Sequence, residues 1–187
     1  MHEPFDDSDM RIAGDHPSRE LLADDHGDEA VRERENGNLE RARQLGALMA
    51  GEVWSLDSEN ANPPESLQVA EQRRLLFAFA AAAGFDFFTP TPLCAHTALG
   101  SFYDTLGREA PALYEGVERS FAFSFYFLHL RREEHPAQGV GQTFAMLCGQ
   151  EGDTAFIDRG AALYQSFLSI IRERANAMGF VPNAPLP

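Results

Sequence analysis

The chain contains no lysine, and this absence limits the chemistry that its 187 residues can perform. All 15 basic residues are arginines, they stand against 29 acidic residues, and the formal net charge is −14. Without a side-chain amine, the protein cannot form a lysine Schiff base with a carbonyl substrate. An acidic balance of this size repels phosphates, so we expect no direct nucleic-acid binding and no membrane binding through a broad basic face.

Cysteine is also scarce, because the chain has only Cys94 and Cys148, each flanked by apolar residues. Two cysteines in a chain of this length do not make a disulfide scaffold, and we predict two buried thiols in a reducing compartment. No uninterrupted apolar run reaches the roughly 18 residues that a membrane span needs. The N-terminal sequence MHEPFDDSDM lacks the apolar core of a signal peptide. A cytoplasmic location is therefore expected.

Motifs of the common catalytic and metal sites are missing as well. There is no Cys-x-x-Cys, His-Glu-x-x-His, Glu-x-x-His or Gly-x-Ser-x-Gly sequence. Cys94 and His96 are two residues apart, which turns their side chains to different sides of a helix. We expect no metal and no other cofactor, and the sequence argues against an enzyme.

Apolar residues recur at helical spacing between residues 38 and 179, which predicts an all-α fold of five or six helices in one orthogonal or up-down bundle. The expected helices span roughly 38–56, 63–83, 92–106, 111–132, 141–148 and 154–178. Their predicted N-terminal caps include Asn38, Asn62, Thr91 and Asp153, and their predicted C-terminal stops are Gly84, Gly107 and Gly179. Between them, FDFFTPTP is expected to form an extended aromatic loop, and HPAQGVGQ a turn.

The aromatic segment 111–132 is predicted to be the central helix of this bundle. Its middle, FAFSFYFLHL, is apolar on nearly every side, which is typical of a helix that other helices surround. Phe121, Phe123, Phe125 and Phe127 also alternate as they would in a strand. The sequence contains no second predicted strand with which this one could pair, so we favour the helix.

The distribution of charge divides the chain into three parts. Residues 1–37 hold twelve acids and four arginines, a net charge of −8, and few large apolar side chains. They are predicted to form a mobile or loosely docked arm with a short helix after Ser18. Residues 38–179 form the helical domain, and residues 180–187 are expected to be an extended, proline-rich tail.

Fifteen phenylalanines are more than a core of this size usually holds, so some are expected to line a groove or an interface. The candidate binding residues are Phe85, Phe87 and Phe88 in the aromatic loop, together with Tyr103, Tyr126 and His129. The leading hypothesis is a non-enzymatic interaction or regulatory module that binds a protein partner, or itself, through an aromatic surface.

Three other functions remain open. The bundle could hold an apolar small molecule among its Phe, Tyr and Met side chains. His129 could act as the base of an enzyme with a nearby carboxylate such as Glu133. The acidic surface could also mimic nucleic acid, which would require carboxylates at phosphate-like spacing.

Overall fold

Within residues 18–55, 66–132 and 136–182, which a computed structural model of the chain describes, all regular structure is helical. Side chains are described for residues 27–53, 66–130 and 136–182. The described helices are α1 (Ser18–Glu35), α2 (Asn38–Ser55), α3 (Leu67–Phe88), α4 (Pro92–Glu109), α5 (Pro111–Arg119), α6 (Ala122–Arg132), α7 (Pro136–Leu147) and α8 (Thr154–Met178). The predicted all-α class is confirmed, but the described residues form eight helices instead of five or six.

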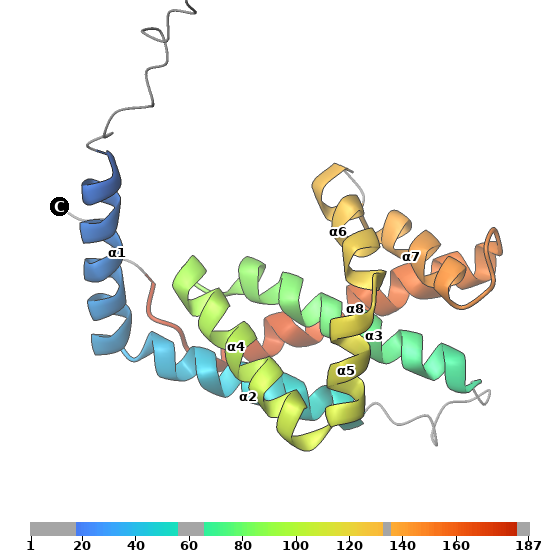
Figure 1. The fold of residues 1–187 in the computed structure, drawn as a ribbon, viewed down its shortest axis with the longest axis horizontal. Helices are drawn as coiled ribbons and strands as arrows, with labels where there is room; N and C mark the ends of the chain where they lie inside the picture. The colour runs from blue at the N-terminus through green and yellow to red at the C-terminus, as the bar shows by residue number, and fades with distance from the viewer. Residues whose placement is uncertain (1–17, 56–65, 133–135, 183–187) are drawn as a thin grey trace, which may run out of the picture.

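Helix α3 is the centre of the fold, and helices α2 and α4 to α8 all contact it (Figure 1). From Leu76 to Phe85 every residue of α3 is buried, because four consecutive alanines let neighbouring backbones approach from several sides. Gly84 lies inside this run against the side chain of Ile171 on α8, where an added Cβ would come within 2.8 Å of Ile171 Cγ2. The predicted stop at Gly84 is wrong, since this glycine serves close packing within the helix.

The aromatic segment 111–132 does not form the predicted single central helix. It divides into α5 and α6, because Ser120 is extended and its hydroxyl accepts the backbone N–H of Ala122 at 3.1 Å. Such a local side-chain bond competes with the continuing helix. Helix α6 then packs one face on α3, where Tyr126 and Phe123 contact the ring of Phe79. The opposite face of α6 is exposed.

Two further predictions of irregular structure are wrong. The sequence FDFF forms the last turn of α3, which ends when the backbone N–H of Thr89 bonds to Phe85 O. Most of the predicted turn HPAQGVGQ belongs to α7, which begins at Pro136. The predicted helix start at Asn62 and Pro63 lies outside the described residues, and Ser66 caps α3 by accepting the N–H of Val69.

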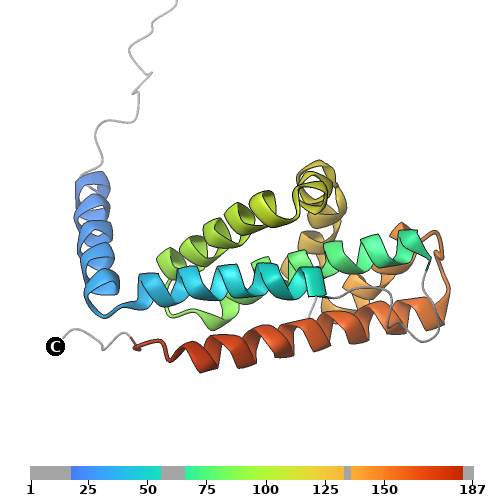
Figure 2. The same ribbon diagram turned by 90° about the horizontal axis from the view of Figure 1, so that it is seen from below.

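The boundaries of the last helix agree with the sequence. The Asp153 carboxylate accepts the N–H groups of Ala155 and Phe156, and Gly179 ends α8 in the left-handed conformation at φ 64°. Thr91 likewise caps α4 by accepting the N–H of Cys94, as predicted. Helix α4 continues past the predicted stop at Gly107 to Glu109. Figure 2 shows α8 running along the whole body beside α2.

Two pairs of helices pack at glycines. Gly46 of α2 lies against the backbone of Ala98 and Phe102 on α4, and Gly141 of α7 lies against the backbone of Ile157 on α8. In both places the contact is with backbone, so a larger side chain would have to move a whole helix.

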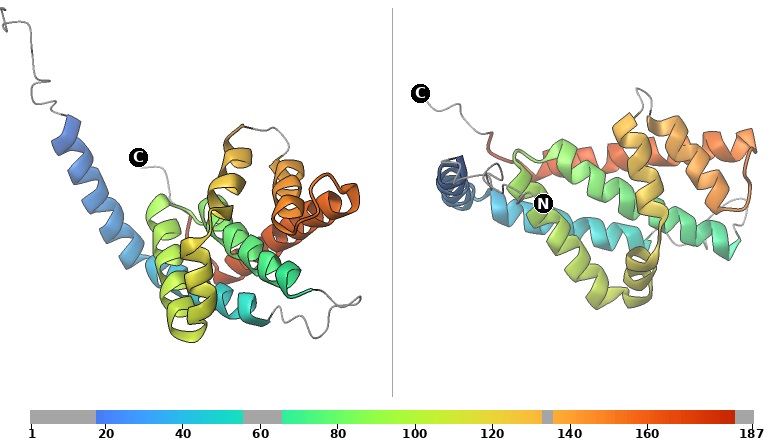
Figure 3. Two further views of the ribbon diagram at one scale, coloured as in Figure 1. Left: turned by 45° about the vertical axis from the view of Figure 1, so that its right-hand side comes forward. Right: turned by 45° about the horizontal axis from the view of Figure 1, so that its top comes forward.

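Helix α1 projects from one end of the body (Figures 2 and 3). A buried polar junction joins it to the body. Asn38, predicted as a helix cap, is fully buried and uses its side chain differently. Its amide donates to Glu33 Oε2 at 2.7 Å and to Val181 O at 2.9 Å, while its carbonyl accepts the N–H of Val181 at 2.9 Å. One side chain thus ties α1, the start of α2 and the segment after α8.

We expect Asn38→Ala to lower the free energy of unfolding by about 2 kcal/mol, because it removes the side-chain hydrogen bonds to Glu33 and Val181 and leaves buried groups unsatisfied. Hydrogen exchange at the amide of Val181 should become much faster, since that N–H loses its acceptor. The exposed Asn176 on α8 provides a control, and Asn176→Ala should change neither quantity. Unaltered protection at Val181 in Asn38→Ala would contradict the junction.

Tyr126 provides a second prediction about the core. Its side chain is fully buried, and among the described atoms its hydroxyl finds no hydrogen-bond partner. Burial raises the pKa of this phenol far above its usual range, so the hydroxyl stays protonated. Tyr126→Phe should therefore raise the free energy of unfolding by about 1 kcal/mol in urea denaturation.

The matched control is Tyr114→Phe on α5, whose hydroxyl donates to Glu118 Oε1 at 2.6 Å on the surface. That change should be neutral or slightly destabilising. A loss of stability in Tyr126→Phe larger than in Tyr114→Phe would mean that the buried hydroxyl has a partner after all.

Candidate functional site: a hollow and an exposed apolar stripe on α6 and α7

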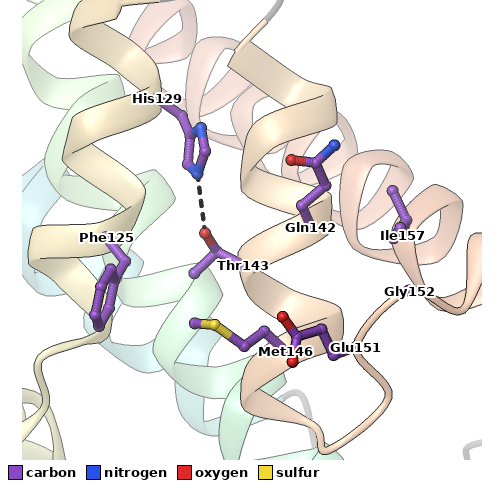
Figure 4. Close-up of a pocket in the computed structure, with 8 residues that line it drawn as sticks. All are labelled: Phe125, His129, Gln142, Thr143, Met146, Glu151, Gly152 and Ile157. Carbon is purple, nitrogen blue, oxygen red and sulfur yellow. Dashed lines mark hydrogen bonds between the residues drawn. The ribbon is translucent and has the colours of Figure 1, made fainter.

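A hollow of about 410 Å³ lies between α6, α7 and the start of α8. Its walls are formed by Phe125, His129, Gln142, Thr143, Met146, Glu151, Gly152 and Ile157 (Figure 4). Three of these, Phe125, Met146 and Ile157, are apolar, and the only carboxylate is that of Glu151. The hollow can therefore accept an apolar group and has polar atoms on parts of its rim.

His129 and Thr143 connect the two helices across this hollow. Nε2 of His129 on α6 lies 3.1 Å from Oγ1 of Thr143 on α7, and Figure 4 shows the two side chains pointing toward one another. Thr143 is buried and His129 is half-buried. This hydrogen bond holds α6 at a fixed spacing from α7, which keeps the hollow open between them.

An apolar stripe runs along the outer face of α6 beside the hollow. Phe121, Phe125 and Leu128 are separated by four and three residues, so they lie on one side of the helix. Their side chains are 80 %, 44 % and 44 % exposed. Met146 of α7, 37 % exposed, lines the same hollow as Phe125. We call these four residues the α6–α7 patch.

The inner face of α6 explains why this stripe is left outside. Ala122 and Tyr126 are buried, and Phe123 and Leu130 are partly buried against the core. At about 100° per residue these four positions lie roughly opposite Phe121 and Leu128. The helix thus has two apolar faces, and the fold uses one of them.

The two ionisable side chains among the residues that line the hollow, His129 and Glu151, lie at its opposite ends. In Figure 4 Thr143 and Met146 lie between them. Glu133, the carboxylate that the sequence placed near His129, lies outside the described residues. In the part of the chain that the structure describes, no three His, Cys, Asp or Glu side chains come together to hold a metal ion.

Both cysteines are buried, as predicted. Burial, and to a lesser degree the neighbouring carboxyl group of Glu33, raises the pKa of Cys94 to about 11. Its Sγ lies 3.5 Å from Glu33 Oε2, so the thiol stays protonated as a hydrogen-bond donor.

The six predicted binding residues do not form one site. Phe85 and Tyr126 are fully buried, so their rings belong to the core and not to a contact surface. Phe88 and Tyr103 are partly buried against that core. Phe87 is 57 % exposed at the end of α3. Among the six, only His129 lines the hollow.

The remaining members of the site were missed by the sequence reasoning. Phe121, Phe125 and Leu128 were assigned to the core, although their spacing already marked a continuous stripe. Met146 and Ile157 come from the two helices that follow α6, and no local signal in the sequence places them beside it.

A second hollow, of about 370 Å³, lies between α3 and α5. It is lined by Glu71, Gln72, Arg74, Leu75, Ala112, Leu113 and Gly116. The side toward α3 is mostly polar, and none of the Phe, Tyr or Met side chains of the small-molecule hypothesis lines it. This hollow is also separate from the exposed aromatic residues.

No protein-family model, curated protein or solved structure matches this chain. None of the helices that the structure describes combines the length and apolar character that crossing a bilayer requires.

Proposed function

We propose that the protein is a non-enzymatic helical interaction module that binds a protein partner, or a second copy of itself, through the α6–α7 patch. The observation that carries this proposal is the exposed stripe of Phe121, Phe125 and Leu128 beside an apolar hollow. Soluble proteins seldom leave large side chains together in water unless another surface covers them.

The composition of the patch supports a protein surface as the ligand. Aromatic residues and methionine are enriched where proteins contact each other, and charged residues are depleted at the centre of such contacts. From Ala122 to Leu130 the sequence of α6 has no Asp, Glu or Arg. The hollow is open at the surface, which suits a projecting side chain better than an enclosed small molecule.

The surrounding chemistry favours binding over catalysis. His129 is engaged with Thr143, and in Figure 4 Glu151 lies at the other end of the hollow from it. The buried Cys94 thiol has a raised pKa and stays protonated at neutral pH. The site therefore offers shape and apolar area but no activated group.

Photo-crosslinking from the patch tests this proposal. A benzoylphenylalanine placed at position 125 of the full chain should give discrete covalent products, either with itself or with another protein, in a cell extract. The same photoreactive residue at position 87 is the matched control, because Phe87 is another exposed ring, 57 % accessible at the far end of α3.

The outcome also decides between the two aromatic surfaces. Products from position 125 with none from position 87 support the α6–α7 patch. Products from position 87 alone would move the contact surface to the FDFF turn. Absence of discrete products from position 125 would contradict the proposed function.

A further inference from the structure

The α6–α7 patch contains both a projecting ring and a hollow that can receive one. Phe121 is 80 % exposed at the start of α6, and its backbone carbonyl accepts the N–H of Phe125, one turn further on. Phe125 is a wall of the hollow. A projection and a hollow therefore lie about one helical turn, some 5 Å, apart on the same face.

We propose that the occupant of this patch is a second copy of the same chain, related by a two-fold axis that passes near Phe125. This inference rests on the proposed function and specifies its partner. In a two-fold contact the same surface is used by both copies, so it must be complementary to itself. A projecting ring next to a hollow larger than that ring meets this requirement.

Helix geometry gives the register of the contact. A two-fold axis perpendicular to α6 at Phe125 sets the two α6 helices antiparallel. Phe121 is four residues before the axis, so it lies opposite residue 129 of the other copy, which is the His129 wall of the hollow. The Phe125 rings then face each other at the axis. Each dimer contains the Phe121-to-hollow contact twice.

The distribution of charge permits this pairing and predicts how salt affects it. Two copies each carry a formal charge of −14, which opposes their association. The α6 stripe has no Asp, Glu or Arg between residues 122 and 130, and Glu151 is the one carboxylate among the residues that line the hollow, so most of the repelling charge lies away from the contact. Added salt screens the repulsion and should strengthen the dimer. A basic partner helix would show the opposite dependence.

The size of the patch sets the strength of the dimer. Phe121, Phe125, Leu128 and Met146 together expose about two whole side chains, which is roughly 400 Å² in each copy at about 150–250 Å² for a whole aromatic side chain. The four residues bury about 800 Å² in the pair, which is below the range of tight complexes. We therefore expect a reversible dimer that forms in the micromolar range and above.

Sedimentation velocity of the full chain between about 1 and 500 μM tests this inference. The wild type should pass from monomer to dimer, with tighter association at 500 mM than at 50 mM NaCl. Phe121→Ser should weaken association at least tenfold. The variant should fold normally, because the ring of Phe121 is exposed to solvent. Phe87→Ser, which removes another exposed ring, should associate like the wild type.

A complementation experiment distinguishes the two-fold contact from nonspecific association. Gln142 lines the hollow from an exposed position on α7, so Gln142→Trp should fill it without disturbing the core. Each variant alone loses both Phe121-to-hollow contacts. An equimolar mixture of Phe121→Ser and Gln142→Trp restores one, because Phe121 of the second variant can enter the hollow of the first. The mixture should associate more tightly than either variant alone.

Several results would overturn the inference. A wild type that remains monomeric at 500 μM in both salts excludes the dimer. A mixture that associates no better than its components excludes the two-fold contact between Phe121 and the hollow. If discrete crosslinks from position 125 persist in the extract under those circumstances, the proposed function stands with a different partner. If those crosslinks are also absent, both proposals fail.

Discussion

Gly46→Ala should lower the free energy of unfolding by about 3 kcal/mol, the largest loss that we expect from adding one methyl group to this protein. The added Cβ would overlap the carbonyl oxygen of Ala98 and lie 2.9 Å from the backbone nitrogen of Phe102. Both atoms belong to the backbone of α4, so no side chain can rotate away. Helices α2 and α4 must separate, and the melting temperature should fall by about 6–12 °C.

A second glycine of α2 provides the control. Gly51 is exposed, and an added Cβ would have no atom within 4 Å. Gly51→Ala should therefore raise stability by up to about 1 kcal/mol through the better helix propensity of alanine. The two variants are compared by urea denaturation and calorimetry. Equal stabilities would show that α2 and α4 do not touch at Gly46.

Gly141→Ala should cause a loss of similar size, about 3 kcal/mol, at the crossing of α7 and α8. The new Cβ would overlap the carbonyl oxygen of Ile157 and lie 3.0 Å from the nitrogen of Ala161. Gly160, on the other side of the crossing, has the Cα of Gly141 at 3.0 Å from its own added Cβ. Neither helix therefore has room for an added methyl group at this crossing.

This second substitution should also affect the α6–α7 patch. Thr143 and Met146, which line the hollow, lie on the helix that Gly141→Ala displaces from α8. We therefore expect weaker crosslinking from position 125 together with the loss of stability. Gly100→Ala on α4, where an added Cβ meets nothing within 4 Å, should change neither. Stability equal to that of Gly100→Ala would contradict the close crossing.

Local signals in the sequence predicted the ends of several helices because they act over only a few residues. Thr91 and Asp153 accept N–H groups two or three positions ahead, and Gly179 takes up its left-handed conformation next to the helix that it ends. Each of these interactions is complete within one turn, so sequence alone is enough to find it.

The sequence does not distinguish a glycine that ends a helix from a glycine that allows close packing inside one. Gly179 ends a helix through its positive φ, whereas Gly84 stays helical and makes room for Ile171. Nothing beside Gly84 in the sequence reveals a neighbour 87 positions away. The FDFF turn was therefore predicted as a loop, and the aromatic contact surface was placed there.

The uniformly apolar sequence of α6 does not show which of its faces is exposed, so the α6–α7 patch could not be predicted. Both Tyr126, which is buried, and Phe125, which is 44 % exposed, satisfy the pattern of a core residue. Periodicity locates the faces of a helix but does not say which face packs when both are apolar. That choice depends on the path of the chain after Ser120, where α6 turns away from α5.

The junction at Asn38 also imposes an order on assembly during synthesis. Val181 follows Asn38 by 143 residues, so the ribosome must make nearly the whole domain before this contact can form. Until then the polar groups of Asn38 and Glu33, which are buried in the finished fold, remain hydrated. Attachment of α1 through this junction is therefore a late event, and a nascent chain stalled before residue 181 should leave α1 open to proteases.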